Sequence, residues 1–436
     1  MRRFSAVPFV LASACAALAS CTPAERANDH VSPENPMWIH RPSGAMHVVV
    51  RRALTAESRN AGEQYERGRA EIDPVHGRVF IGSSDRGLYA LRSDDGSTIW
   101  RFETMGVVQC EPLYDAGRDT VYFGSHDGAL YAVRASDGQL LFRFATGAEV
   151  TRKPVLVDGT LFVANGNDTL FALDSANGKT KWQAHRSPAL GMEVAGYAGP
   201  AFDRGKIYMA FSDGNVTAYD AKDGSERWTP VDLGADAERV AGETPKYLDV
   251  DTTPVFDDMK PGVRAVFVAR YVGGVSALDS ETGSRLWSND QASGVTDLLL
   301  WTEPAHAPNA DGPYAGGPAV PERHVLVASS ATTGVWGMDP LTGRMLWKNK
   351  VPDGGVTAPV PVAGALVVGT TRYGLFLMSP REGLVIDGFD VGTGFAVTPA
   401  AFGHRAFAMS NTGVFVGVDV NPPIALGHRG HAWPAP

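Results

Sequence analysis

Few residues in this sequence stand at spacings that could support catalysis. None of the eleven histidines pairs with another at metal-ligand spacing within a strand or helix, and the three cysteines form no Cys-x-x-Cys motif. The sequence contains no Gly-x-Ser-x-Gly nucleophile motif and no glycine-rich phosphate loop. His428 and His431 could contact a metal, but a polar tail is the favoured explanation. We therefore expect no catalytic site, no metal and no cofactor.

Asp249 and Asp251 are the acidic pair with the clearest spacing. They lie in the string Tyr247-Leu-Asp-Val-Asp-Thr-Thr-Pro-Val255, and side chains two residues apart point to the same side of a strand. Three interpretations are open: a solvated or turn-capping pair, an acidic patch that binds a partner, and a calcium site. Calcium usually takes six or more oxygen ligands, and the spaced acidic loop of an EF-hand is absent.

Cys21 is the cysteine whose surroundings indicate a modification. Residues 1–20 have a basic start, an apolar run from Ala6 to Ala19 and then small residues, which is the pattern of an export signal. The end, Leu18-Ala19-Ser20-Cys21, resembles the lipobox of bacterial lipoproteins, and this implies that Cys21 carries the lipid. Ordinary cleavage near Ser20 is the alternative. More than one acyl chain gives a stable anchor, and residues 21–34 would then be a flexible tether.

The sorting rule of such lipoproteins bears on the destination. Thr22 is not Asp, so the resemblance implies the outer membrane, on its periplasmic side. With Cys15 removed in the leader and Cys21 lipidated, Cys110 has no partner for an intramolecular disulfide. We expect Cys110 to be a small buried hydrophobic residue rather than a reactive thiol.

The charge balance limits the direct partners. The chain carries 48 acidic and 39 basic residues, a net charge of -9, and loss of Arg2 and Arg3 with the leader would bring it to -11. Nucleic acid and anionic lipid are themselves negative, so the composition argues against either as a direct partner.

The elements that must position these residues are repeated. Seven glycines each follow a small or apolar residue by six positions, and in five of the seven units a Trp comes four residues after the glycine. The glycines are Gly96, Gly138, Gly178, Gly224, Gly283, Gly343 and Gly383, and the aromatics are Trp100, Phe142, Trp182, Trp228, Trp287 and Trp347. Asp387 replaces the aromatic in the seventh unit, and Gly417 marks a degenerate eighth copy. A period near 40 residues is typical of a repeat array.

Each repeat reads as four antiparallel strands. In the second copy, Asp127-Gly128 and Asp137-Gly138 separate runs of β-branched and aromatic residues, and Asp-Gly favours hairpin turns. Eight such sheets in a ring predict an all-β, eight-bladed β-propeller over residues 35–423, in which the Trp side chains fill the wedges between blades. The eighth copy ends after its third strand, before Pro422-Pro423. We expect an N-terminal strand, at Pro36–Arg41, to close the ring, and a polar tail over 424–436.

Three connecting segments are candidates for function, since loops on a rigid scaffold often carry it. The first, from Trp228 to Thr253, contains the acidic pair. The second includes Leu298-Leu-Leu-Trp301, which is either the innermost strand of blade six or an exposed partner contact, and a Pro/Gly-rich insertion over about 303–321. The third, Ser187–Gly196, contains Leu190 and Met192, for which core packing and a surface contact are equally open.

The repeats resemble those of the pyrroloquinoline-quinone-type propeller superfamily, through Ala172-Leu-Asp174 before Trp182 and Ala277-Leu-Asp279 before Trp287. Within that superfamily, Leu248–Val255 and Val266–Asp279 are similar to the BamB-like lipoproteins of the outer-membrane β-barrel assembly machinery. Ala365–Gly369 and Gly394-Phe395, with the Pro399 that follows, are similar to the same family. The Asp-Val-Asp-Thr-Thr-Pro string is the most specific part of the resemblance.

The resemblance implies a non-catalytic scaffold that docks to the POTRA repeats of a BamA-like subunit, as a monomer within a hetero-complex. It assigns partner binding to Asp249 and Asp251 and to a segment occupied here by Leu190, Met192 and Glu193. Glu193 stands where the family has a basic residue, so the electrostatic part of that contact is altered. Two alternatives are open: a propeller of another cell-envelope assembly, and a quinone-dependent dehydrogenase, whose adjacent cysteines this chain lacks.

Overall fold

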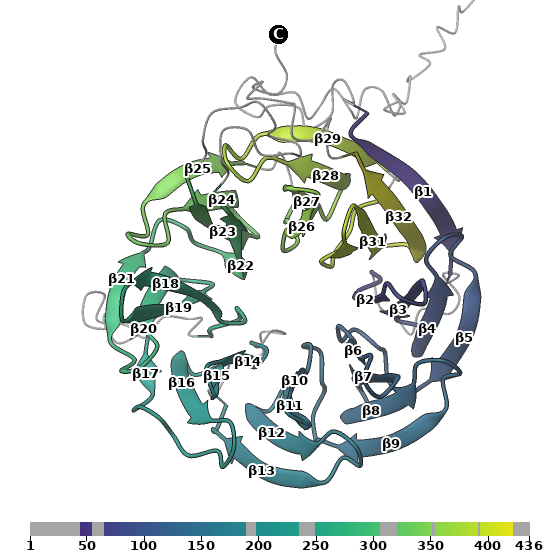
Figure 1. Ribbon diagram of the computed structural model, residues 1–436, viewed down its shortest axis with the longest axis horizontal. Coiled ribbons are helices and arrows are strands. Elements are labelled where there is room, and N and C mark those ends of the chain that lie inside the picture. The colour runs from purple at the N-terminus through teal and green to yellow at the C-terminus, as the bar shows by residue number, and fades with distance from the viewer. Residues whose placement is uncertain are drawn as a thin grey trace, which may run out of the picture.

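The computed structural model describes residues 44–54, 65–188, 198–234, 249–305, 321–350, 354–390 and 393–421. The predicted leader, tether and C-terminal tail lie outside these residues, as does Pro36–Arg41. The described chain forms eight sheets of four antiparallel strands arranged in a ring around a central channel (Figure 1), which confirms the predicted propeller. Among the described residues, no helical segment has the length and apolar character needed to span a bilayer.

Each blade runs from an innermost strand at the channel to an outermost strand at the rim (Figure 1). Blades one to four are β2 Ala70–Asp73, β3 Arg78–Gly82, β4 Gly87–Arg92 and β5 Thr98–Glu103; β6 Leu113–Asp115, β7 Thr120–Ser125, β8 Ala129–Arg134 and β9 Leu140–Ala145; β10 Val155–Val157, β11 Thr160–Asn165, β12 Thr169–Asp174 and β13 Thr180–His185; β14 Ala201–Asp203, β15 Lys206–Ala210, β16 Asn215–Asp220 and β17 Val231–Asp232.

The remaining blades follow the same order, except that the last takes its outermost strand from the N-terminal end of the chain. Blades five to eight are β18 Val255–Lys260, β19 Val263–Arg270, β20 Gly274–Asp279 and β21 Arg285–Asn289; β22 Val295–Glu303, β23 Arg323–Ser330, β24 Gly334–Met338 and β25 Met345–Asn349; β26 Val360–Val362, β27 Ala365–Gly369, β28 Gly374–Met378 and β29 Val385–Asp390; β30 Ala400–Phe402, β31 Arg405–Met409, β32 Val414–Val420 and β1 Met46–Ala53.

The repeated residues lie at the same register of the two outer strands in blades one, two, three, five, six and seven. Ala132 of β8 pairs with Phe142 of β9, and the register shifts directly after Ala132. Ala90 with Trp100, and Ala277 with Trp287, show the same pairing followed by the same shift. The small residue of the repeat therefore lies opposite the aromatic one, and a β-bulge follows, which adds twist to the outer edge of the blade.

The aromatic side chains join each blade to the next, as the repeats predict. Nε1 of Trp100 in blade one donates a hydrogen bond of 2.9 Å to the backbone oxygen of Ala135 in blade two. The indole ring also covers Gly138 of blade two, where an added Cβ would lie 2.8 Å from Trp100 Cδ2. The same ring-on-glycine contact recurs in five further wedges, in the pairs Phe142–Gly178, Trp182–Gly224, Trp228–Gly283, Trp287–Gly343 and Trp347–Gly383.

The hydrophobic core is divided among the wedges rather than gathered in one centre. The described residues form eight buried apolar clusters, and each draws on two neighbouring blades. The cluster between blades one and two, for example, combines Phe80 and Leu88 with Val121 and Tyr131. No blade can bury both faces alone, so the ring is stable only as a whole.

The ring closes through an N-terminal strand, as predicted, but through a different segment. The closing strand is Met46–Ala53, which pairs antiparallel with β32, and not Pro36–Arg41. Val50 pairs with Gly417 and packs on Gly96 of blade one, so an aliphatic side chain takes the place of the aromatic in this wedge. The strand carries no Trp, which is why the repeat pattern did not identify it.

Asp387, the exception in the repeats, takes part in this closure. Asp387 is buried and is the register partner of Leu377 in the neighbouring strand β28, the position that an aromatic residue has in blades one, two, three, five and six. Asp387 Oδ2 accepts a hydrogen bond of 2.9 Å from the backbone nitrogen of Met46, the first residue of β1. Asp387 supplies a hydrogen-bond acceptor at this position because its neighbour is the backbone N–H of Met46. Met46 begins β1, a strand from a distant part of the sequence.

Replacing Gly138 by Ala tests the ring-on-glycine contact. Gly138 has φ +74°, and the added methyl would press on Trp100. We expect the free energy of unfolding to fall by about 1–3 kcal/mol more than in the control Gly159→Ala. Gly159 has φ +71° but nothing closer than Ser175 Oγ at 4.0 Å, so it carries only the backbone strain. Equal denaturant midpoints for the two variants would contradict a packing role for the ring.

Candidate interaction site

The two faces of the propeller differ in what they carry. Because the strands of a blade alternate in direction, the turns between second and third strands lie on the same face as the connections between blades. We call this the link face, and the opposite one, which holds the other two turns of each blade, the turn face. The candidate segments are distributed between these faces.

The Leu298–Trp301 run belongs to the innermost strand of blade six, which confirms one of its two interpretations. Leu298 packs in the wedge with blade five, Leu299 in the wedge with blade seven, and Trp301 is buried. The strand ends at Glu303, and its hairpin partner begins at Arg323. Both ends of the predicted insertion therefore lie at the turn face, away from the connections between blades. Residues 306–320 themselves lie outside the described chain.

The segment that holds the acidic pair is bonded to several blades at the link face. Val250 donates a backbone hydrogen bond of 3.3 Å to Phe211 in blade four. The hydroxyl of Thr252 accepts one of 2.7 Å from Ala269 in blade five. Arg152 Nη2, at the entrance to blade three, donates one of 3.0 Å to the backbone oxygen of Asp251. The string that the sequence singled out is thus part of the frame that joins blades three, four and five.

Both carboxyl groups of the pair are buried, which the sequence did not predict. Asp249 is 2% exposed and Asp251 7% exposed, so the pair is neither solvated nor an open acidic patch. Burial raises the pKa of Asp251 to about 8, and the neighbouring Asp249 carboxyl adds to the shift. At neutral pH the Asp251 carboxyl is therefore largely protonated, which lowers the cost of placing two acids together out of water.

The two predicted docking segments return to the propeller at the same place. Leu190, Met192 and Glu193 lie outside the described residues, and so does the stretch 235–248 before the acidic pair. Gly199, just after the first segment, donates a backbone hydrogen bond of 3.0 Å to the hydroxyl of Thr253, just after the second. The fold therefore brings together two links that are 54 residues apart. Partner binding by the five predicted docking residues stays a prediction. They are Leu190, Met192, Glu193, Asp249 and Asp251.

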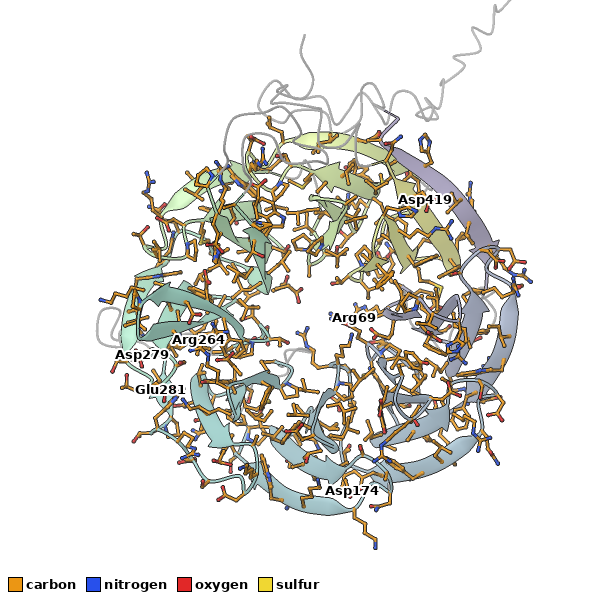
Figure 2. All side chains as sticks on the ribbon, in the orientation of Figure 1. Arg69, Asp174, Arg264, Asp279, Glu281 and Asp419 are labelled. Carbon is orange, nitrogen blue, oxygen red and sulfur yellow. The ribbon has the colours of Figure 1, made fainter. Side chains whose placement is uncertain are left out.

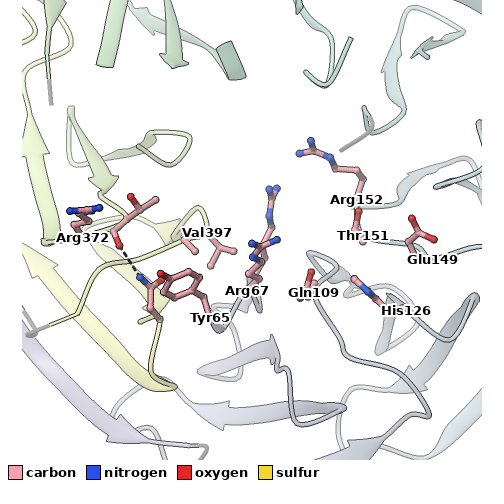
Figure 3. Close-up of a pocket in the computed structure, with 13 residues that line it drawn as sticks. Tyr65, Arg67, Gln109, His126, Glu149, Thr151, Arg152, Arg372 and Val397 are labelled. Carbon is pink, nitrogen blue, oxygen red and sulfur yellow. Dashed lines mark hydrogen bonds between the residues drawn. The ribbon is translucent and has the colours of Figure 1, made fainter. Parts of the chain in front are cut away.

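A cavity of about 660 Å³ occupies the link-face mouth of the central channel (Figure 3). Its described lining includes Arg67 and Arg69 of blade one, Arg152 before blade three and Arg372 in the turn between β27 and β28, with Glu149 as the single acid among the described lining residues. Four guanidinium groups against one carboxylate give this described lining a formal charge of +3, although the chain as a whole is at -9. No sequence motif marks this cluster, because its members are far apart in the chain.

Ion pairs connect the first three blades near the start of their innermost strands. Lys153 Nζ lies 2.6 Å from Glu71 and 2.9 Å from Glu111. Burial opposes a charge on Lys153, but the carboxylates of Glu111 and Glu71 outweigh it and raise its pKa. The lysine is thus held charged between two acids, at a point where the innermost strands of three blades begin.

Cys110 is a buried core residue in the wedge between blades two and three, as predicted. Its sulfur lies 3.1 Å from the backbone oxygen of Arg152. Burial raises the pKa of the thiol to about 12, so the reactive thiolate form is not populated near neutral pH.

The described residues offer no metal site of the kind considered for the acidic pair. No group of three or more His, Cys, Asp or Glu side chains lies close enough together in the described ranges to hold an ion. Cys110 is also the single free cysteine in these ranges, so the described chain has no neighbouring cysteine pair. The residues present therefore do not fit a calcium-bound quinone.

The comparisons with known proteins agree with the repeat architecture. A family model described as outer membrane protein assembly factor BamB matches residues 84–303 and 295–394. The outer membrane protein assembly factor BamB of Yersinia pestis is 27% identical over 339 residues, which cover 77% of this chain and 67% of that protein. Two further relatives with the same description are matched over only 52% of their own length.

Two other comparisons show how far the similarity in fold and in sequence extends. The crystal structure of BamB from Moraxella catarrhalis superposes with a TM-score of 0.65 at 19% identity, covering 86% of this chain and 99% of that one, which shows the shared fold. The quinohemoprotein alcohol dehydrogenase ADH-IIG of Pseudomonas putida is 31% identical, but over 32% of this chain and 19% of its own length.

The substitution Asp251→Asn tests the buried acid through the pH dependence of stability. The folded protein keeps the Asp251 proton up to a pH of about 8, whereas the unfolded chain loses it near 3.8. The folded state thus binds more protons across this window, and the free energy of unfolding falls as pH rises, by up to about 1.4 kcal/mol per pH unit.

An amide cannot ionise, so we expect Asp251→Asn to lack this loss. The measurement is the denaturant midpoint of both proteins from pH 4 to pH 9, and the difference isolates Asp251, since all other groups are common to both. Parallel profiles would show that Asp251 is charged in the folded protein.

Proposed function

The chain belongs to the family of the outer membrane protein assembly factor BamB, and from this membership we propose that it is a non-catalytic adaptor of outer-membrane protein assembly. The family model matches most of the ring, from blade one to blade seven. A rigid ring with functional groups on its inter-blade links suits a docking role better than turnover. Propellers host many activities, so the proposal depends on the family and on the site, and not on the fold alone.

Within that role, the protein docks to the POTRA repeats of a BamA-like subunit through the link face between blades three, four and five. The observation that carries this proposal is the hydrogen bond between Gly199 and Thr253, which anchors the two predicted docking links side by side. Leu190, Met192 and Glu193 belong to the first link and contact the partner. Asp249 and Asp251, being buried, act by holding the second link in place.

A lipid on Cys21 places this docking surface at the periplasmic side of the outer membrane. The lipobox-like end of the leader supports this assignment. A tether of residues 21–34 then separates the ring from the membrane by a flexible stretch.

Two other functions have less support. A quinone-dependent dehydrogenase is favoured by the partial likeness to quinohemoprotein alcohol dehydrogenases, but the described residues do not fit a calcium-bound quinone. An adaptor of another cell-envelope assembly has the same fold and anchor, and differs from our proposal only in the partner retained.

Affinity purification from native membranes, solubilised gently, tests the proposed partner. We expect the tagged full-length protein to retain the BamA-like subunit, and the double variant Asp249→Asn, Asp251→Asn to retain about tenfold less. Amides match the carboxyls in size, and Asp251 is already largely neutral, so the ring should still fold.

The matched control is Asp94→Asn with Asp95→Asn, two exposed acids at a turn-face hairpin of blade one. This control should retain the partner fully. Retention of a different set of envelope proteins by the unaltered chain would favour the alternative assembly.

The anchor is tested separately with Cys21→Ser. Because a serine cannot accept the thioether-linked lipid, we expect the variant to move from the membrane pellet to the soluble fraction of cells. Cys110→Ser is the control, since that thiol is buried in the ring and should leave the membrane association unchanged. Continued pelleting of Cys21→Ser in high salt would argue against lipidation at this residue.

A further inference from the structure

The arginines of the channel mouth come from three separate walls of the cavity. Arg67 and Arg69 precede β2 in blade one, Arg152 precedes β10 in blade three, and Arg372 belongs to blade seven. Arg69 points into the central opening of the ring (Figure 2). Arg67 and Arg152 project into the same cavity from different sides, and Arg372 lies beyond them on a third (Figure 3).

The described part of the chain does not neutralise the blade-one arginines. Arg67 is exposed and forms no ion pair or hydrogen bond there. Arg69 reaches Glu111 only at 3.9 Å, and Glu111 is already bound to Lys153 at 2.9 Å. Glu149, the single acid of the lining, packs over Gly166 in blade three and points away from Arg67 (Figure 3). Two guanidinium groups therefore face the cavity with little internal compensation.

Arg152 differs, because its guanidinium group already contacts the segment that joins blades three, four and five. Its Nη2 donates to the Asp251 backbone, and its Nη1 lies 3.7 Å from Asp297 in blade six. It contributes positive charge to the cavity while holding the acidic segment of the proposed docking surface. The cavity and that surface thus share a residue and open on the same face of the ring.

Such a mouth selects ligands by charge. A cleft lined by one sign of charge focuses the potential and raises the local concentration of oppositely charged groups. The planar fork of arginine matches carboxylates in two parallel hydrogen bonds. Since the chain as a whole carries a net negative charge, a negatively charged partner is disfavoured by the overall charge and favoured at this cavity.

We propose that the channel mouth binds an acidic, extended segment of a partner polypeptide, with carboxylates paired to Arg67 and Arg69. The guanidinium groups are spread over three walls rather than gathered around one point, which favours several carboxylates along a chain over one compact anion (Figure 3). The inference rests on the proposed function, in that the partner is a component or client of the assembly complex.

The test is fluorescence anisotropy with the full-length protein and a short labelled peptide of alternating glutamate and glycine. We expect saturable binding that weakens as salt is raised. The double variant Arg67→Gln, Arg69→Gln should bind about tenfold more weakly or worse. Arg67→Lys with Arg69→Lys should bind with an affinity between that of the glutamine variant and that of the unaltered protein, because lysine keeps the charge but not the two parallel hydrogen bonds. The matched control is Arg92→Gln with Arg134→Gln, an exposed and a partly exposed arginine at turn-face hairpins, which should bind as the unaltered protein does.

Three results would overturn the inference. They are equal binding of a peptide with glutamine in place of glutamate, unchanged binding by the Arg67 and Arg69 glutamine variant, and displacement of the peptide by inorganic phosphate at an equal concentration of charge. The last would indicate a site for a compact anion only. Equal denaturant midpoints for all variants exclude unfolding as the cause of a loss.

The result of the peptide-binding test can be distinguished from the result of the affinity purification that tests the proposed docking. If the unaltered chain retains the BamA-like subunit but binds no acidic peptide, this inference fails alone. If it binds the peptide and retains no assembly subunit, the proposed function fails while the channel site stands.

Discussion

The contact between an aromatic ring in one blade and a glycine in the next is the constraint on which the molecule depends. The glycine is needed twice, for the left-handed backbone of the hairpin and for the space that the ring fills, as Gly138 and Trp100 illustrate. The indole hydrogen bond to a backbone oxygen then sets the angle between the blades. Because each wedge holds a separate apolar cluster, no blade has a core of its own, and the stability of the ring is shared by all eight.

The ring is closed by different contacts, at the blade where the N-terminal strand β1 pairs with β32. Asp387 stands in for the aromatic and accepts a hydrogen bond from Met46, while Val50 fills the wedge against blade one. Closure removes the free sheet edges that would otherwise invite pairing with other chains. With the ring fixed in this way, the links between blades are held at one face, and the proposed docking residues gain a rigid support.

The burial of Asp249 and Asp251 changes the interpretation of the Asp-Val-Asp-Thr-Thr-Pro string. From the sequence, Asp249 and Asp251 could be a solvated or turn-capping pair, an acidic patch that binds a partner, or calcium ligands. In the structure they lie under the surface, beside a backbone held by Arg152. A carboxyl that keeps its proton can be placed next to another carboxyl without the full cost of two buried charges. The charged side chains that line the cavity on this face are mainly the arginines around the channel mouth.

The sequence alone determined the repeat, the blade count and the burial of Cys110, since these follow from local periodicity and from turn residues that act within a few positions. It placed the closing strand wrongly, because Met46–Ala53 lacks the Trp that marks the other outer strands. Only the tertiary structure decided that the acidic pair is buried and that Arg67, Arg152 and Arg372 share one cavity. Those facts depend on which distant segments meet when the ring closes, and no local pattern in the chain encodes that meeting.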